Sequence, residues 1–229
     1  FRFIGPDGNR AIAISGVSSD HNIYYVGAAS GGLFKTTNKG ISWEPIFDDQ
    51  DVSSVSAIAI SQKNPNIVWA GTGETFLIRP AHAIGDGIYK SEDGGNTWKN
   101  MGLQKTARIA KIVIHPKNDK IVYVAALGHT FGPQEDRGIY KTTNGGKTWK
   151  KILFIDQNTG GIDIALDRKN PNFLIASMWE IYINTWGLNS GGESGGVFIS
   201  KNAGKSWERQ DKNGLPGGKG KPVGKIAVS

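Results

Sequence analysis

Short runs of apolar residues recur along the chain and alternate with polar, turn-forming segments. The runs are rich in Ile, Val and Tyr, and Asn-Pro or Pro-Lys-Asn sequences separate several of them, which predicts antiparallel strand pairs joined by turns. No stretch shows a helical period, so we expect little helix. The predicted strand pairs are residues 11–15 with 23–28, 56–60 with 67–71, 111–114 with 121–126, and 162–166 with 173–178.

A third apolar run follows each pair after a loop of variable length, and it leads into a repeated octapeptide. The octapeptide reads Ser/Thr, any, Asp/Asn, any, Gly, any, Ser/Thr, Trp, and it occupies residues 36–43, 91–98, 142–149 and 200–207. Its tryptophans are 55, 51 and 58 residues apart. A near-constant period of this size indicates a repeat architecture.

The residue types of the octapeptide predict a tight turn between two strands. The Asp or Asn side chain can accept hydrogen bonds from backbone N–H groups just ahead of it, and the Gly supplies a positive φ. The Trp opens the next strand and can pack against a neighbouring repeat. Three copies carry Asn, so the motif requires no carboxylate, and we interpret it as structural rather than as a metal or sugar site. The structural residues are Asn38, Gly40, Trp43, Asp93, Gly95, Trp98, Asn144, Gly146, Trp149, Asn202, Gly204 and Trp207.

The octapeptide resembles the Asp box, or bacterial neuraminidase repeat, of sialidases, sortilin-type receptors, xyloglucanases and photosystem II assembly factors. The segments between the boxes are similar to those of large secreted bacterial proteins described as sortilin-like or glycosyl-hydrolase-like. These segments include Phe3-Ile4-Gly5-Pro6, Gly71-Thr72-Gly73-Glu74 and Ala125-Ala126-Leu127-Gly128-His129. The resemblance implies a β-propeller and an extracytoplasmic location, either secreted, periplasmic or at the cell surface.

Four short strands in each unit would make one propeller blade. We therefore expect an all-β chain with one partial propeller domain, whose blades span approximately residues 1–50, 51–105, 106–156 and 157–215. Residues 216–229 would begin a fifth blade. Four blades and one strand would leave an open face and an unpaired edge, so we expect an N-terminal part of a longer propeller, with the remaining blades as its partner.

The charge distribution adds little evidence for a nucleic-acid partner. The net charge is +7, and residues 199–229 carry seven basic side chains against two acidic ones. The lysines lie beside turns, with no clustered Arg and no recognition helix, so we expect no nucleic acid as partner.

No apolar run approaches the roughly 18 residues of a transmembrane segment. The absence of Cys excludes disulfides and thiol chemistry.

The long loops between the second and third strands are where we expect a ligand. They span residues 74–86, 128–137 and 179–193, on the face opposite the boxes. Their aromatic rings suit stacking on sugars or peptide side chains, and their arginines suit a carboxylate; the alternative is that the aromatics form small loop cores and the charges pair locally. The candidate ligand-binding residues are Glu74, Arg79, His82, Asp86, His129, Glu135, Arg137, Trp179, Glu180, Tyr182 and Trp186.

These residues favour a binding module for a protein, peptide or glycan, and no catalytic residue can be assigned. The histidines His82 and His129 have no second ligand at metal spacing, so we expect neither metal nor cofactor. A glycoside hydrolase is the alternative, and an assembly factor for a membrane complex is a third hypothesis. Resemblance to xyloglucanases implies an aspartate before Gly31-Gly32, where Ala29 stands, and resemblance to sialidases implies an arginine triad that the sequence does not show.

Overall fold

The structure is almost entirely β, as the sequence predicts. This computed structural model describes residues 5–6, 10–75, 83–212, 214–215, 217–218 and 220–229. Across these residues the helical content is one short 3-10 turn, η1 (Gln104–Thr106). The backbone therefore satisfies its hydrogen bonds mainly through strand pairing and turns.

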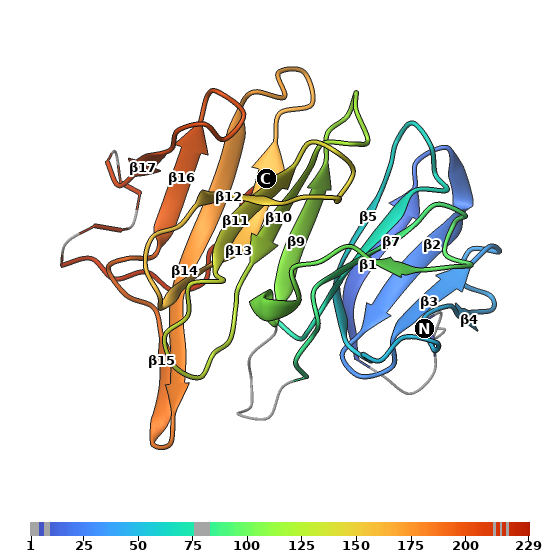
Figure 1. Cartoon of the computed structure of the whole chain (residues 1–229), viewed down its shortest axis with the longest axis horizontal. Helices are drawn as coiled ribbons and strands as arrows, with labels where there is room; N and C mark the ends of the chain where they lie inside the picture. The colour runs from blue at the N-terminus through green and yellow to red at the C-terminus, as the bar shows by residue number, and fades with distance from the viewer. Residues whose placement is uncertain (1–4, 7–9, 76–82, 213, 216, 219) are drawn as a thin grey trace.

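The strands form four antiparallel sheets that follow one another along the chain (Figure 1). In each sheet the strands are hydrogen-bonded in chain order, which is the connectivity of a propeller blade. The sheets are β1 (Ala11–Val17), β2 (Asp20–Ala28), β3 (Leu33–Thr36) and β4 (Glu44–Pro45); β5 (Val55–Ile60), β6 (Val68–Thr72), β7 (Ile88–Ser91) and β8 (Lys99–Asn100); β9 (Ile109–Ile114), β10 (Val122–Ala126), β11 (Gly138–Thr142) and β12 (Lys150–Leu153); and β13 (Thr159–Leu166), β14 (Leu174–Asn184), β16 (Gly196–Ser200) and β17 (Glu208–Gln210).

Hydrogen bonds within each box hold the turn between the third and fourth strands. In the second box the N–H of Thr97 donates to Asp93 Oδ1 at 2.9 Å, and the N–H of Gly95 donates to Ser91 Oγ at 2.8 Å. The same two bonds recur in the other three boxes. The glycine at the fifth position of the box has a φ between 82° and 99° in all four copies. Glycine adopts this region at the least cost.

Each box turn is also bonded to the turn between the first and second strands of its own sheet. Gly94 N donates to Asn66 O at 2.9 Å, and Gly145 N donates to Lys120 O at 2.9 Å, with equivalent bonds in the first and fourth sheets. These two kinds of turn therefore lie on one face of the molecule, which we call the box face. The loops between second and third strands lie on the opposite face, which we call the loop face.

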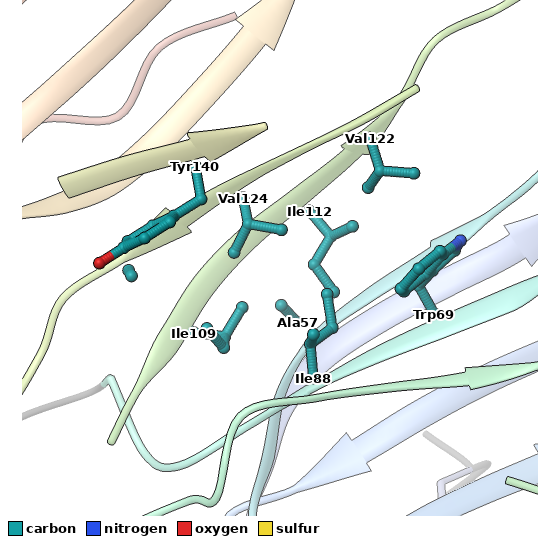
Figure 2. Close-up of a cluster of buried hydrophobic side chains, with 9 residues drawn as sticks. Ala57, Trp69, Ile88, Ile109, Ile112, Val122, Val124 and Tyr140 are labelled. Atoms are coloured by element: carbon teal, nitrogen blue, oxygen red, sulfur yellow. The ribbon is translucent and has the colours of Figure 1, made fainter. Parts of the chain in front are cut away.

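The hydrophobic core lies between the sheets rather than within any one of them. One cluster joins Trp69 of β6 and Ile88 of β7 to Ile109 and Ile112 of β9 and to residues of β10 and β11 (Figure 2). The box tryptophans complete these contacts: Trp98 Nε1 donates to Ile46 O at 2.7 Å, across the boundary with the preceding sheet. Each sheet is thus stabilised mainly by its neighbours.

One strand prediction needs correction. β14 does not end near residue 178 but continues to Asn184, because residues after Met178 pair with a further strand, β15 (Gly187–Ser190). Residues 224–229, where we expect a fifth blade to begin, are not paired with a strand of the described chain. They run beside the fourth sheet, where Ser177 Oγ donates to Ile226 O at 2.6 Å and Val228 N donates to Asp163 Oδ2 at 3.1 Å.

Candidate functional site

The most prominent feature of the loop face is a two-stranded arm made by the end of β14 and β15. The two strands are paired from Ile181 with Ser190 to Asn184 with Gly187, and β15 projects beyond the sheets (Figure 1). Sequence reasoning placed an irregular loop here. The arm is regular because buried side chains alternate with half-buried or exposed ones along residues 179–184, as a strand requires.

The third sheet braces this arm through its own loop. Ile183 N donates to Thr130 O at 2.6 Å, and Phe131 forms an isolated parallel bridge with Ile183. Three large apolar side chains are exposed along this part of the loop face: Trp186 is 92% exposed, Phe131 55% and Leu188 49%. We call Phe131, Trp186 and Leu188 the arm surface. The turn that joins the two strands thus presents the Trp186 ring to solvent.

The remaining aromatic candidates lie below this surface. Trp179 is 5% exposed and packs with Leu127, Ile162 and Ile181 in a small loop core, so its ring is largely covered in this structure. Tyr182 is half-buried and lies opposite Asn189 on β15. Of the three aromatic candidates, Trp186 is therefore the one that the structure fully exposes.

Arg137 is a buried anchor whose guanidinium bonds backbone carbonyl groups. Its side chain is fully buried, and its guanidinium donates to Asn158 O at 2.8 Å, to Ile181 O at 3.0 Å and to His129 O. Burial lowers the pKa of Arg137 to about 10. These bonds tie the loop of the third sheet to the base of the arm, so Arg137 positions the arm surface from beneath.

A second buried arginine, Arg108, which is not among the candidate residues, joins the first three sheets. Arg108 Nε donates to Glu74 O at 3.0 Å, and its Nη1 donates to Gly128 O at 3.3 Å. The Glu74 carboxylate, itself buried, forms an ion pair with Arg10. The sequence contained one signal for this role: in the first and third repeats an arginine, Arg10 or Arg108, stands immediately before the first apolar run.

Most candidate acids are engaged in structural hydrogen bonds. Asp86 accepts a bond from Tyr89 Oη at 2.6 Å, and burial, with the Asp86 carboxylate as the next cause, raises the pKa of Tyr89 to about 12. Glu180 accepts a bond from Ser194 N at 3.1 Å. Glu135 is exposed. The structure thus offers no converging pair of unbonded carboxylates among these three residues.

The remaining candidates are His129, Arg79 and His82. His129 is half-buried, and its backbone holds the loop by bonding Gln134 and Arg137. Arg79 and His82 lie outside the described residues. Ala29, where xyloglucanase resemblance implies an aspartate, is 5% exposed, and its N–H donates to Arg10 O at 3.0 Å. The described part of the chain contains no group of three or more potential metal-ligating side chains and no helix with the length and hydropathy to cross a membrane.

Comparison with known proteins gives one family and a consistent set of enzyme relatives. The profile of the Sortilin-Vps10 family (sortilin, neurotensin receptor 3) matches residues 86–214, more than half of the chain. A xyloglucanase of Hypocrea jecorina (strain QM6a) is 24% identical over 226 residues, which covers 87% of this chain and 25% of that protein. The chain therefore spans about a quarter of the length of the curated relatives it matches.

Solved structures show the same fold. An ancestral GH74 enzyme superposes with a TM-score of 0.68 and 23% identity, covering 90% of this chain and 26% of that one. The structure described as YCF48 bound to D1 peptide superposes with a TM-score of 0.50 and 13% identity, covering 90% of this chain and 82% of that one. At these identities the likeness concerns the propeller architecture alone.

Proposed function

The chain belongs to the Sortilin-Vps10 family, and we propose that its loop face binds a polysaccharide as part of a glycoside-hydrolase-type propeller. The observation that carries this proposal is the arm surface, where Trp186 is 92% exposed on a braced strand pair. An indole exposed in this way offers a flat apolar face to a pyranose ring. The curated relatives named xyloglucanases support a polysaccharide as the ligand class.

The proposal gives this chain a binding role and assigns it no catalytic residue. Glycoside hydrolysis needs two carboxyl groups roughly 5–9.5 Å apart, one of them protonated. Asp86 and Glu180 are bonded to neighbouring groups, and Glu74 is buried beside two arginines. We therefore propose that hydrolysis by the whole protein relies on carboxylates other than these three. An extracytoplasmic location, where such polymers occur, is part of the same proposal.

Peptide binding is the second candidate, and one observation favours it. In the described residues β15 is paired on one side only, with β14, so its outer edge presents backbone N–H and C=O groups to solvent. An extended peptide can add to such an edge as a further strand. The structural likeness to YCF48 bound to D1 peptide, and the sortilin family itself, make a peptide a reasonable ligand class to test.

The decisive variant is Trp186→Ala, with Ile41→Ala as its matched control. Ile41 is also a large exposed side chain, at 69%, but it lies in a box turn on the opposite face. We expect Trp186→Ala to weaken retention on xyloglucan about tenfold, which corresponds to about 1.4 kcal/mol. Neither variant should change the melting temperature, because neither side chain is packed.

The same experiment separates the two candidates. The intact protein is incubated with a panel of neutral polysaccharides, and both retention on the polymer and release of reducing ends are measured. Retention that depends on Trp186 but not on Ile41 supports a polysaccharide site. Equal retention for all three proteins contradicts it. Absent retention together with binding of extended peptides, measured by fluorescence anisotropy, supports the edge of β15 instead.

A further inference from the structure

Two grooves on the outer part of the box face repeat from one sheet boundary to the next. Each groove is lined by the third and fourth strands of one sheet and by the box turn of the sheet that follows. The groove between the second and third sheets has a volume of about 750 Å³ and contains Trp98. The groove between the third and fourth sheets has a volume of about 250 Å³ and contains Trp149. Neither groove includes a residue of the arm surface.

Each groove contains lysines at the same three positions of the repeat: in the third strand, in the fourth strand and in the next box. The third-strand lysines are already bonded, since Lys141 Nζ donates to Ala203 O at 2.9 Å and Lys90 contacts Glu92 at 2.5 Å. The other lysines are exposed, and their ammonium groups make no hydrogen bond to a described residue. The exposed lysines at these repeat positions are Lys99 and Lys147 in the first groove and Lys150 and Lys205 in the second, and the first groove is also lined by the exposed Lys120.

The lysines of the second groove lie close enough to repel one another. The pKa of Lys141 is lowered, first by burial and then by the positive charges of Lys205 and Lys150. Like charges gathered without an acidic partner destabilise the fold slightly, and an anionic ligand would relieve this repulsion. The first groove holds one acid, Glu92, which is engaged with Lys90.

The repeat does not itself require these lysines. At the boundary between the first and second sheets the corresponding positions are Lys35, Glu44 and Asn96, and the box supplies the carboxylate of Asp93. That boundary has the same box hydrogen bonds as the others, and Lys35 Nζ donates to Gly94 O at 2.8 Å. Because one boundary forms without the fourth-strand and box lysines, their presence at the next two boundaries calls for a reason other than folding.

We propose that the two lysine grooves on the box face bind a linear acidic polysaccharide, one that carries uronate carboxylates along its length. Lysine ammoniums act as point charges that suit the single, regularly spaced carboxylates of such a polymer, and no arginine lines either groove. The half-buried indoles of Trp98 and Trp149 provide partly exposed ring surface beside the charges for a pyranose ring. This site is independent of the loop face and of its proposed ligand.

The test compares two charge-matched variants of the intact chain for binding to oligogalacturonate. The groove variant is Lys99→Gln/Lys147→Gln/Lys150→Gln/Lys205→Gln, and the control variant replaces four exposed lysines elsewhere, Lys105, Lys117, Lys169 and Lys212, by Gln. Titration calorimetry in about 50 mM and about 300 mM NaCl should show salt-dependent binding by the parent chain. We expect at least about tenfold weaker binding for the groove variant and less than about twofold for the control.

A second variant tests the same site by gain of binding. Glu44→Lys/Asn96→Lys gives the first boundary the lysines of the other two, and both positions are exposed. We expect about threefold tighter binding or more, whether or not the groove variant folds. Equal losses in the groove and control variants, no gain from the added lysines, or no binding by the parent chain would overturn the proposal. Groove-dependent binding of single-stranded DNA with none of oligogalacturonate would overturn the ligand class.

Discussion

At the scale of single residues, the second box differs from the others because it carries a carboxylate. Asp93 accepts bonds from the hydroxyl and the N–H of Thr97 and from Ser91 Oγ, and these bonds, first that of the Thr97 hydroxyl, lower its pKa from 3.8 to about 2. The third box makes the equivalent contacts with a neutral side chain, since Asn144 Nδ2 donates to Thr148 Oγ1 at 2.8 Å. The carboxylate is therefore replaceable by an amide without loss of the turn.

We predict that Asp93→Asn removes an acid-sensitive part of the stability. A carboxyl group whose pKa is lowered by folding stabilises the folded state above its unfolded pKa, and this contribution is lost as pH falls through the folded value. The parent chain should thus lose stability between about pH 4 and about pH 2 more steeply than the variant. Urea unfolding at several pH values measures this, and parallel pH dependences would contradict the expectation.

Some roles of single residues could be predicted from the sequence and others could not. The box hydrogen bonds follow from residue type and spacing, because their partners lie within a few residues of each other. The roles of Arg137 and Trp179 did not follow, since their burial depends on carbonyl groups and apolar side chains from distant loops. Side-chain chemistry identified polar and aromatic residues on one face, but only the fold distinguishes the exposed Trp186 from the buried Trp179.

At the scale of elements, the box turns are also packing surfaces. Gly146 has a φ of 91°, and a Cβ there would lie 2.6 Å from Cη2 of Trp69 in the preceding sheet. Gly132 has a similar φ of 74°, but a Cβ there would have no neighbour within 4 Å. Gly132 is therefore needed only for its backbone conformation, whereas Gly146 is needed both for its backbone conformation and for the close contact between two sheets.

We predict a large difference between Gly146→Ala and Gly132→Ala. The second should cost only the strain of a left-handed alanine, about 1 kcal/mol. The first adds a steric clash with a buried ring and should cost about 1–3 kcal/mol more, because a close-packed interior accommodates an extra methyl group poorly. Chemical denaturation of both variants measures the difference in their free energies of unfolding. Equal losses for the two variants would show that the contact between the sheets rearranges without a measurable penalty.

The arm is the element that sequence reasoning missed, although its signal was present. Residues 179–184 alternate apolar and polar positions, which is typical of a strand, and Asn184 and Gly187 flank a two-residue turn. The assignment as a loop came from comparison with the other repeats, where the equivalent strand is shorter. The regular spacing therefore predicted the strands that all four repeats share, but it did not predict the arm, which only the fourth repeat has among the described residues.

At the scale of the whole molecule, stability should be shared across sheet boundaries. Ile109 is fully buried in the cluster that joins the second and third sheets (Figure 2). We predict that Ile109→Ala costs about 2–5 kcal/mol, whereas Ile41→Ala, at an exposed position, costs less than about 0.5 kcal/mol. Urea unfolding followed by both Trp fluorescence and circular dichroism should give coincident curves, and separated transitions would show that the sheets unfold independently.

The boundaries between sheets also bear on how such a chain grows during evolution. The first boundary is closed from both sides: Lys35 donates forward to Gly94 O in the next box, and Trp98 of that box donates back to Ile46 O. The second boundary keeps the tryptophan bond, from Trp149 to Met101 O, and the third keeps the lysine bond, from Lys141 to Ala203 O. One repeat therefore carries both halves of the contact. A tandem duplication of its coding segment would produce two neighbours that already fit each other, so blade number can change by copying without the need to invent a new interface.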